Sequence, residues 1–553
     1  MSDATSSSSQ SSDLGVARVP WWKAGPIYQI FPRSFSDSSG DGVGDIRGII
    51  SKLDYLNNGS EESLSVKAIW LSPIYVSPGR DAGYDVSEHT VIDPMFGTME
   101  DFEVLIAECK KRDIKVIMDI VLNHTSNMSP WFIDSLSSKT SAHRDWFIWS
   151  DPKRGGGPPN NWLSWFGGPG WTFDEDSQQY YMHTFKREQP ELNWRNPEVR
   201  AACLDVMRFW LDRGVSGLRL DVFNAYFKHP ELLDNPRRLG MSKWNRQHQI
   251  NNKNQPDLHG YLDELRALLD SYPEAMAVGE TFDGRAEVAA SYCKKLHMGF
   301  NFNVAEQKWH PRGIQDAISK WNKLLSDEDT WPCYFMSNHD LPRHSVRFSK
   351  GVDIVEADAR AKVVAAMMFT LRGTPFVYYG EEIGMRDVEI PEDEQFDTEV
   401  IMGSRDPART PMQWDSSPNA GFSSATPWLR ISIDYKKRNV ELQESDPHSI
   451  LNFYRRVSNL RANSPVLLSG TWRPLIKKPD KAMVYLREYQ DQYVLVALNF
   501  TNKKIRVKLD ANLSISQWRL LLSTCRESGG NDEQIENSFE LEPYEASIFS
   551  AQE

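Results

Sequence analysis

The sequence predicts a (β/α)₈ barrel followed by a small antiparallel β domain. Short apolar segments, bounded by turn or polar residues, alternate eight times with longer amphipathic segments over most of the 553 residues. This alternation is typical of a parallel barrel with helices around it. After about residue 465 the pattern changes to runs in which apolar and polar residues alternate with a period of two, which is typical of antiparallel strands.

The expected barrel strands are nearly continuous apolar runs, as in sheets that are covered on both faces. They lie at 26–32, 66–73, 114–122, 216–220, 275–279, 298–302, 333–337 and 374–380. Helical patterns lie between them, for example at 99–112, 197–213, 258–272 and 359–372.

Two connections are too long for simple barrel loops: the stretch from His124 to Asn196, rich in Trp, Gly and Pro, and the stretch from Glu381 to about Asp446. The predicted organisation is a disordered serine-rich tail at 1–15, a barrel at 16–124 and 197–465, an inserted domain at 125–196 and a C-terminal β-sandwich domain at 466–553. Strands of the last domain are expected at 483–489, 493–500, 505–510, 518–523 and 538–550.

Composition excludes several classes of protein. There are 63 basic and 76 acidic side chains, a net charge of −13, which argues against nucleic-acid partners and anionic membrane surfaces. We find no apolar stretch long enough to cross a membrane and no secretory signal at the N-terminus. The five cysteines are scattered without C-x-x-C spacing, which indicates a reducing compartment. We therefore expect a soluble, cytoplasmic protein.

Ionisable residues follow several of the expected strands, and in a barrel such residues face one shared mouth. They are His124, Arg219, Asp221, Glu280, His339 and Asp340. Each of them alone also has a structural explanation as a helix cap, a first-turn charge or a buried histidine. Three carboxylates gathered at one rim are costly unless the protein uses them, so together they indicate a catalytic site.

Local motifs around these residues resemble those of the α-amylase superfamily, glycoside hydrolase family 13. The matching segments, in the family's order, are DIVLNH (119–124), GLRLD (217–221), VGET (278–281) and SNHD (337–340). QPELN (189–193) and RTPMQWD (409–415) resemble the oligo-1,6-glucosidase subfamily, although Glu191 stands where that subfamily usually has Asp. The resemblance covers nearly the whole chain, from about Trp21 to the C-terminal domain.

The resemblance implies retaining cleavage of a glycosidic bond. It makes Asp221 the nucleophile that forms a glucosyl-enzyme, Glu280 the acid and then the base, and Asp340 the residue that holds substrate hydroxyls. Retaining chemistry requires about 5–5.5 Å between the two reacting carboxyl groups. Arg219 shares the strand face of Asp221 and is expected to keep it ionised, whereas burial and nearby carboxylates should raise the pKa of Glu280.

The subfamily resemblance also implies a closed pocket for one glucose. Asp81 would bind terminal hydroxyls, Tyr84 would stack on the ring, and Arg409 would pair with Asp81 and block the cleft. Further pocket residues implied by the family are His124, His339, Phe166 and Phe185. For the arginine pair a surface ion pair is the alternative, and for the two phenylalanines the alternative is core packing of the inserted domain. We expect removal of one glucose from the non-reducing end.

Substrate preference is open. In the subfamily, Val directly after the nucleophile, here Val222, accompanies α-1,6 activity, so isomaltose-type substrates are favoured. Cleavage of maltose or sucrose is one alternative, and transglucosylation or sucrose isomerisation is another. The loop LPRHSVRF (341–348) lacks the arginine-rich signature of the isomerases. A non-catalytic scaffold, like the heavy chains of amino-acid transporters, is disfavoured because the three carboxylates are present.

A second expected site lies in DSSGDGVGDIRG (37–48), where alternate oxygen ligands suit a hard cation. The residues are Asp37, Ser39, Asp41, the carbonyl of Val43, and Asp45. Gly48 at the twelfth position excludes an EF-hand, and a Gly/Asp-rich turn is the alternative. The subfamily binds Ca²⁺ or Mg²⁺ here, so we expect a structural cation, no organic cofactor, and a monomer or homodimer that acts on a small oligosaccharide.

Overall fold

The computed structural model describes residues 19–327, 330–398, 403–509, 517–526, 534–535 and 538–552. The expected tail at 1–15 lies outside these residues. In the described part no helix is long and apolar enough to cross a membrane.

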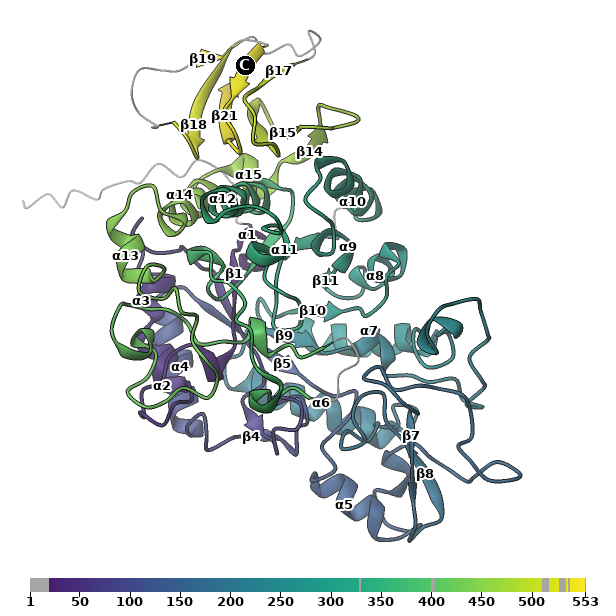
Figure 1. The fold of residues 1–553 in the computed structure, drawn as a ribbon. Helices are drawn as coiled ribbons and strands as arrows, with labels where there is room; N and C mark the ends of the chain where they lie inside the picture. Colours follow the sequence, from purple (N-terminus) through teal and green to yellow (C-terminus); the bar gives the residue numbers. More distant parts are fainter. Residues whose placement is uncertain are drawn as a thin grey trace, which may run out of the picture.

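Eight parallel strands form a nearly closed barrel, as predicted (Figure 1). The neighbouring order is β11-β10-β9-β5-β2-β1-β13-β12, and the two end strands contact each other. The strands are β1 (Ile27–Ile30), β2 (Ala68–Leu71), β5 (Lys115–Ile120), β9 (Gly217–Leu220), β10 (Met276–Glu280), β11 (Met298–Phe300), β12 (Cys333–Tyr334) and β13 (Thr374–Tyr378).

The register of three neighbouring strands positions the site. In the β5–β9 ladder Asp119 lies opposite Arg219, and in the β9–β10 ladder Arg219 lies opposite Val278. Two residues beyond these positions come Asp221 and Glu280, on the same strand faces because side chains alternate along a strand. All these side chains therefore meet at the carboxyl end of the barrel.

The predicted helices surround the strands. They include α4 (Met99–Lys111), α6 (Pro197–Asp212), α7 (Asp257–Asp270), α10 (Pro311–Leu324), α12 (Ile354–Thr370) and α14 (Ile450–Ala462). Local capping explains two of their starts: Thr98 forms a capping box with Asp101 before α4, and the Asp353 side chain accepts a hydrogen bond from the Glu356 N–H before α12. Because Asp353 caps it, α12 begins five residues before the predicted range.

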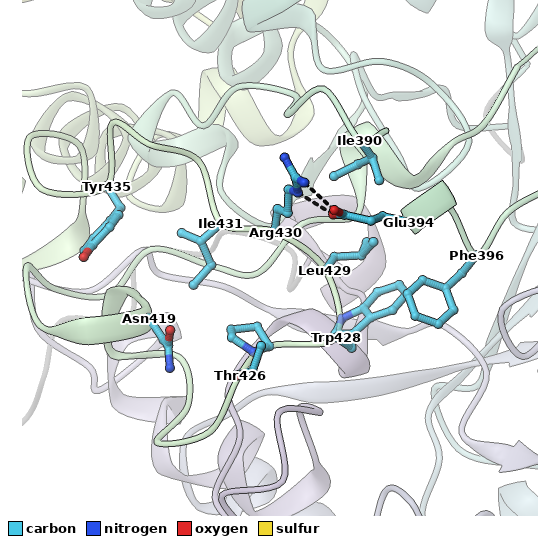
Figure 2. Close-up of a pocket in the computed structure, with 11 residues that line it drawn as sticks. Ile390, Glu394, Phe396, Asn419, Thr426, Trp428, Leu429, Arg430, Ile431 and Tyr435 are labelled. Carbon is cyan, nitrogen blue, oxygen red and sulfur yellow. Dashed lines mark hydrogen bonds and ion pairs between the residues drawn. The ribbon is translucent and has the colours of Figure 1, made fainter. Parts of the chain in front are cut away.

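The two long connections carry structure of their own. Between β5 and α6 lie α5 (Pro130–Ser137) and a three-stranded sheet, in the order β6 (Trp149–Ser150), β8 (Gln179–Met182) and β7 (Trp171–Asp174). An antiparallel bridge between His124 and Glu191 ties this region to the barrel. The connection after β13 runs to α13 (Val440–Ser445) through short 3-10 turns and forms the surface groove of Figure 2.

The C-terminal region is antiparallel, as predicted. A six-stranded sheet has the order β14-β15-β16-β21-β18-β19, and β17 (Ile505–Lys508) pairs with β20 (Ser538–Leu541) in a second sheet. The two sheets share one apolar cluster that contains Phe539 and Phe549. The other bounds are β14 (Thr471–Pro474), β15 (Ala482–Tyr489), β16 (Gln492–Asn499), β18 (Trp518–Ser523), β19 (Gln534–Ile535) and β21 (Ala546–Gln552).

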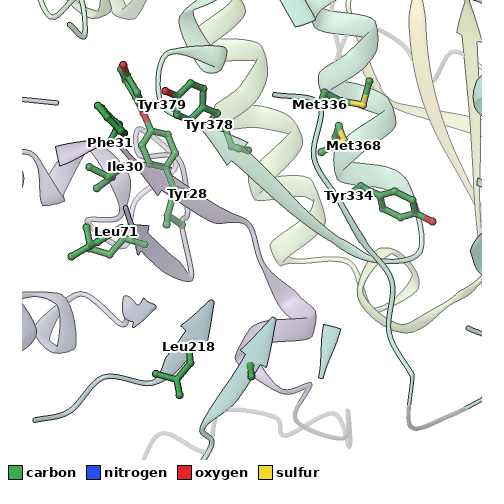
Figure 3. Packing of buried hydrophobic residues seen from close by; sticks show 14 of the residues in the cluster. Tyr28, Ile30, Phe31, Leu71, Leu218, Tyr334, Met336, Met368, Tyr378 and Tyr379 are labelled. Atoms are coloured by element: carbon green, nitrogen blue, oxygen red, sulfur yellow. The ribbon is translucent and has the colours of Figure 1, made fainter. Parts of the chain in front are cut away.

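The barrel strands separate two apolar cores. In β2, Ile69 and Leu71 join the cluster against the outer helices, whereas Trp70 joins the cluster inside the barrel. Figure 3 shows members of the outer cluster, including Tyr28 from β1 and Met368 from α12. Because both faces are covered by apolar side chains, the polar groups at the strand ends are held on a rigid support.

Candidate active site

Arg219 joins three carboxylates at the mouth of the barrel. Its Nη1 lies 2.6 Å from Asp119 Oδ1 and 2.6 Å from Asp221 Oδ1, and its Nη2 lies 2.5 Å from Glu280 Oε2. The arginine side chain is only 1% exposed. The structure thus brings Asp221 and Glu280 onto one guanidinium, although they are far apart in the chain.

Burial raises the pKa of all three carboxyl groups that lie beside Arg219. Burial raises the pKa of Asp221 to about 7, with Arg219 opposing the shift, and raises the pKa of Glu280 to about 8. The pKa of Asp119 is raised to about 6 by the same cause. Asp221 in its ionised form raises the pKa of Glu280 further, so ionisation of one carboxyl group makes the other hold its proton more tightly.

Asp340 is surrounded by two arginines and a histidine. Its Oδ1 lies 2.9 Å from Arg405 Nη1 and 3.3 Å from Arg409 Nη2, and its Oδ2 lies 3.2 Å from His339 Nε2. Burial alone would raise its pKa, but these neighbours bring the pKa well below its ordinary value.

His339 lies between Gln29 and Asp340. Its Nδ1 lies 2.8 Å from the side-chain amide nitrogen of Gln29, a donor, which favours the tautomer with the ring proton on Nε2, the nitrogen that lies 3.2 Å from Asp340 Oδ2. Burial lowers the pKa of His339 to about 3, so the ring is neutral near pH 7. The ring also stacks on Tyr84, with centroids 5.0 Å apart.

The expected ion pair between Asp81 and Arg409 is wrong, because Arg405 takes this place. Arg405 Nη2 lies 2.6 Å from Asp81 Oδ1. Arg409 is fully buried instead: its Nε donates to the His339 carbonyl (2.8 Å), and its Nη2 lies beside Asp340. The short 3-10 turn Asp406–Ala408 separates the two arginines and directs them to different partners.

Most of the other expected pocket residues line one cavity of about 400 Å³. Its wall includes Asp81, Tyr84, His124, Phe166, Phe185, Asp221, Val222, Glu280, His339 and Asp340. Phe166, Phe185 and Val222 form a small apolar cluster at this wall, and the Phe166 ring lies 5.1 Å from the guanidinium of Arg405. Arg219 and Arg409 are not among the described residues that line the cavity, since both lie behind carboxylates.

Tyr84 and His124 are tied to the floor of the site. The Tyr84 hydroxyl donates to Asp119 Oδ2 (2.8 Å). The His124 Nε2 lies 2.9 Å from the Tyr84 carbonyl and 3.0 Å from the amide nitrogen of Gln189. Gln189 in turn donates to Asp81 Oδ2 (3.0 Å), so one network connects the floor with the Asp81 wall.

Val222 has an unusual backbone. Its φ of 38° lies in the left-handed region, which is strained for a β-branched residue. This conformation directs its N–H toward Glu280 Oε2, 3.4 Å away. Val222 thus contacts Glu280 as well as the cavity.

The other wall of the cavity is largely aromatic. Trp165 and Phe282 stack with centroids 4.6 Å apart, and Phe302, Leu341 and Pro342 add apolar surface. Glu306 and Asp387 are the two further carboxylates here, and burial raises the pKa of both.

Sequence reasoning missed three residues of the site. Asp119 and Gln189 stand inside motifs that were recognised, and Arg405 stands four residues before the recognised RTPMQWD segment. The available signal for Asp119 was a carboxylate inside an otherwise apolar strand, which needs a buried partner.

In the loop expected to hold a cation, the carboxylates accept hydrogen bonds from nearby N–H and hydroxyl groups. Asp37 accepts hydrogen bonds from the N–H groups of Gly40 and Gly42 and from Ser39 and Ser423 hydroxyls. Asp45 accepts from the Ser38, Ser39 and Gly48 N–H groups, and Asp41 accepts from the Val43 N–H. In the described part of the chain no three His, Cys, Asp or Glu side chains converge as metal ligands. The loop as folded does not form a carboxylate cage, and a cation here stays a prediction.

Comparison with known proteins agrees with this geometry. Residues 29–470 match the model of the alpha-amylase catalytic domain. A probable alpha-glucosidase of Rhizobium meliloti (strain 1021) is 40% identical over 87% of this chain and 90% of its own length. An oligo-1,6-glucosidase of Parageobacillus thermoglucosidasius is 37% identical over 96% of this chain and 98% of its own. The crystal structure of the alpha-glucosyl transfer enzyme XgtA superposes with a TM-score of 0.87 at 36% identity, covering 97% of this chain and 100% of that one.

Proposed function

The chain belongs to the α-amylase superfamily, glycoside hydrolase family 13, and from this premise we propose that it is an exo-acting, retaining α-glucosidase. It removes terminal, non-reducing, α-linked glucose from short oligosaccharides. The observation that carries the proposal is the pair Asp221 and Glu280, bound to one buried arginine at the wall of a cavity of about 400 Å³.

The two carboxylates have separate tasks. Asp221 attacks the anomeric carbon, and Glu280, whose pKa is raised by burial and by nearby carboxylates, protonates the departing oxygen. Water then enters, Glu280 removes its proton, and the bond to Asp221 breaks with retention of configuration. Asp340 stays ionised and accepts hydrogen bonds from glucose hydroxyls, which is the role of the family's third carboxylate.

Exo cleavage follows from the ion pair of Asp81 and Arg405. Together with Asp340 they make a charged wall across the cavity from loops that are distant in sequence. A second glucose beyond this wall would have to separate a buried ion pair, which is costly. The pocket therefore accepts a chain end.

Isomaltose-type α-1,6 linkages are the favoured substrates. The support is Val222 after the nucleophile together with the oligo-1,6-glucosidase relative. The second candidate is cleavage of α-1,4 links or of sucrose, favoured by the relative described as a probable alpha-glucosidase. Transfer of glucose to another sugar uses the same intermediate, and the likeness to the alpha-glucosyl transfer enzyme XgtA favours this third possibility.

The protein acts in the cytoplasm, as a monomer or homodimer, on a small saccharide. The support for this location is that all five cysteines are free thiols, four of them buried, as expected in a reducing compartment.

The test is a panel of isomaltose, maltose, sucrose and trehalose, with release of glucose measured for each. We expect isomaltose to give the highest kcat/KM and the α-anomer of glucose to appear first by NMR. Absence of glucose release from the whole panel would contradict the proposed function, and a preference for maltose or sucrose would replace only the linkage.

A further inference from the structure

We propose that Asp397 is a positioning residue that fixes Arg405 in the wall of the glucose pocket and so determines how tightly a terminal glucose is bound. The inference rests on the proposed function of that pocket. Asp397 belongs to none of the motifs recognised in the sequence.

Asp397 accepts three hydrogen bonds from Arg405. Its Oδ2 accepts from Arg405 Nε (2.7 Å) and from the Arg405 backbone N–H (2.8 Å), and its Oδ1 accepts from Nη2 (2.7 Å). The Asp397 side chain is 1% exposed, and it is not among the described residues that line the cavity. It therefore acts on a bound sugar only through Arg405.

These hydrogen bonds orient the Arg405 guanidinium toward the carboxylates of the pocket. With Nε and one edge of Nη2 bound to Asp397, the planar guanidinium has one orientation left, in which Nη2 reaches Asp81 and Nη1 reaches Asp340. Without Asp397 the Nε loses its acceptor, and the guanidinium is held only by the two carboxylates that must also bind glucose.

The segment that carries Asp397 is itself braced. Asp406 Oδ2 accepts from the backbone N–H groups of Phe396 (2.7 Å) and Asp397 (2.9 Å). Asp397 binds residue 405, and Asp406 binds residues 396 and 397. Each of the two chain segments therefore accepts hydrogen bonds from the other.

The outer side of the segment is anchored in the surface groove. Figure 2 shows Phe396 beside Trp428 and Glu394 paired with Arg430; the two rings are 5.4 Å apart. The Trp428 ring also stacks on the ring of Phe31, and Phe31 in turn stacks on His339. The position of Asp397 is thus set by packing on one side and by hydrogen bonds on the other.

The primary experiment compares wild type, Asp397→Asn, and the control Asp393→Asn, an exposed aspartate of the same segment. Melting temperature establishes folding, kcat and KM are measured on isomaltose, and affinity for glucose is measured by calorimetry. We expect Asp397→Asn to raise KM and weaken glucose binding by about tenfold or more, since a part-buried donor of Arg405 is left unpaired, and to lower kcat less. The control should stay within about twofold of wild type.

A double-mutant cycle with Arg405→Met separates positioning from a general structural role. If Asp397 acts through Arg405, adding Asp397→Asn to Arg405→Met changes KM by less than about twofold. Effects that multiply would overturn the proposal, as would an Asp397→Asn variant equal to wild type. Should Asp397→Asn not fold, the cycle is run with Asp397→Glu, for which the same two results decide.

These outcomes differ from a failure of the proposed function. A wild type that cleaves no α-glucoside would refute the proposed function, whereas glucose affinity would still report on Asp397 without turnover. An active wild type with an unaffected Asp397→Asn variant would refute only the positioning role.

Discussion

Replacing Arg219 by methionine tests the electrostatic core of the site. The substitution keeps an unbranched apolar stem but removes the cation that lies 2.5–2.6 Å from Asp119, Asp221 and Glu280. A unit charge pair at about 4 Å and an effective dielectric constant of about 20 interacts by about 4 kcal/mol. Since about 1.4 kcal/mol corresponds to one pKa unit, the pKa of Asp221 should rise by up to about three units above its value of about 7.

The expected loss of activity follows from this shift. At pH 7 a rise of about two to three pKa units would lower the ionised fraction of Asp221 by about fifty- to five-hundredfold, so kcat/KM should fall by a similar factor. The pKa of Glu280 should rise together with that of Asp221, so the whole pH profile moves to higher pH. Removing one partner from a buried ion pair also costs about 3–5 kcal/mol of stability, so the melting temperature should fall.

The assay is kcat/KM on isomaltose from pH 5 to 9 for wild type, Arg219→Met and Arg208→Met, an exposed arginine of α6 paired with Asp205. The control should match wild type within about twofold. An Arg219→Met variant that keeps more than a tenth of its activity, or loses activity with an unmoved pH optimum, would refute the assignment of Arg219 as the residue that keeps Asp221 ionised.

Four further measurements have defined expected outcomes. Asp221→Asn should leave the melting temperature near that of wild type and abolish hydrolysis, and near-normal turnover would exclude it as nucleophile. Wild-type kcat/KM should follow a narrow bell, rising with pH as Asp221 ionises near 7 and falling as Glu280 loses its proton near 8; a flat profile from pH 5 to 9 would contradict these roles. Val222→Thr should shift preference from isomaltose toward maltose, and an unchanged ratio of kcat/KM values would remove the linkage argument. Ca²⁺ should raise the melting temperature relative to chelator without changing the initial rate; equal melting temperatures would leave loop 37–48 as a hydrogen-bonded turn.

The meeting of the proposed catalytic carboxylates was predictable because barrel topology converts sequence position into spatial position. Asp221 and Glu280 each stand at the end of an apolar run, and all parallel strand ends meet at one mouth. The same reasoning places Asp340 there. The eight strands followed from their apolar runs, because a sheet covered on both faces needs such runs.

The partners of Arg405 and Arg409 were not predictable in the same way. Arg405 and Arg409 lie one short turn apart in a long irregular connection, where no periodicity fixes side-chain direction. Only the folded turn shows that Arg405 reaches Asp81 and Arg409 goes behind Asp340. Asp397 was hidden for the same reason, since it contacts the site through backbone and side-chain geometry of that connection.

Trapping the covalent intermediate tests the central claim most directly. A fluorinated glucosyl donor that forms the glucosyl-enzyme but slows its hydrolysis should add one glucosyl unit to the protein, and peptide mapping by mass spectrometry should locate it on Asp221. A label on any other residue, or steady consumption of the donor with inverted product and no label, would contradict the account.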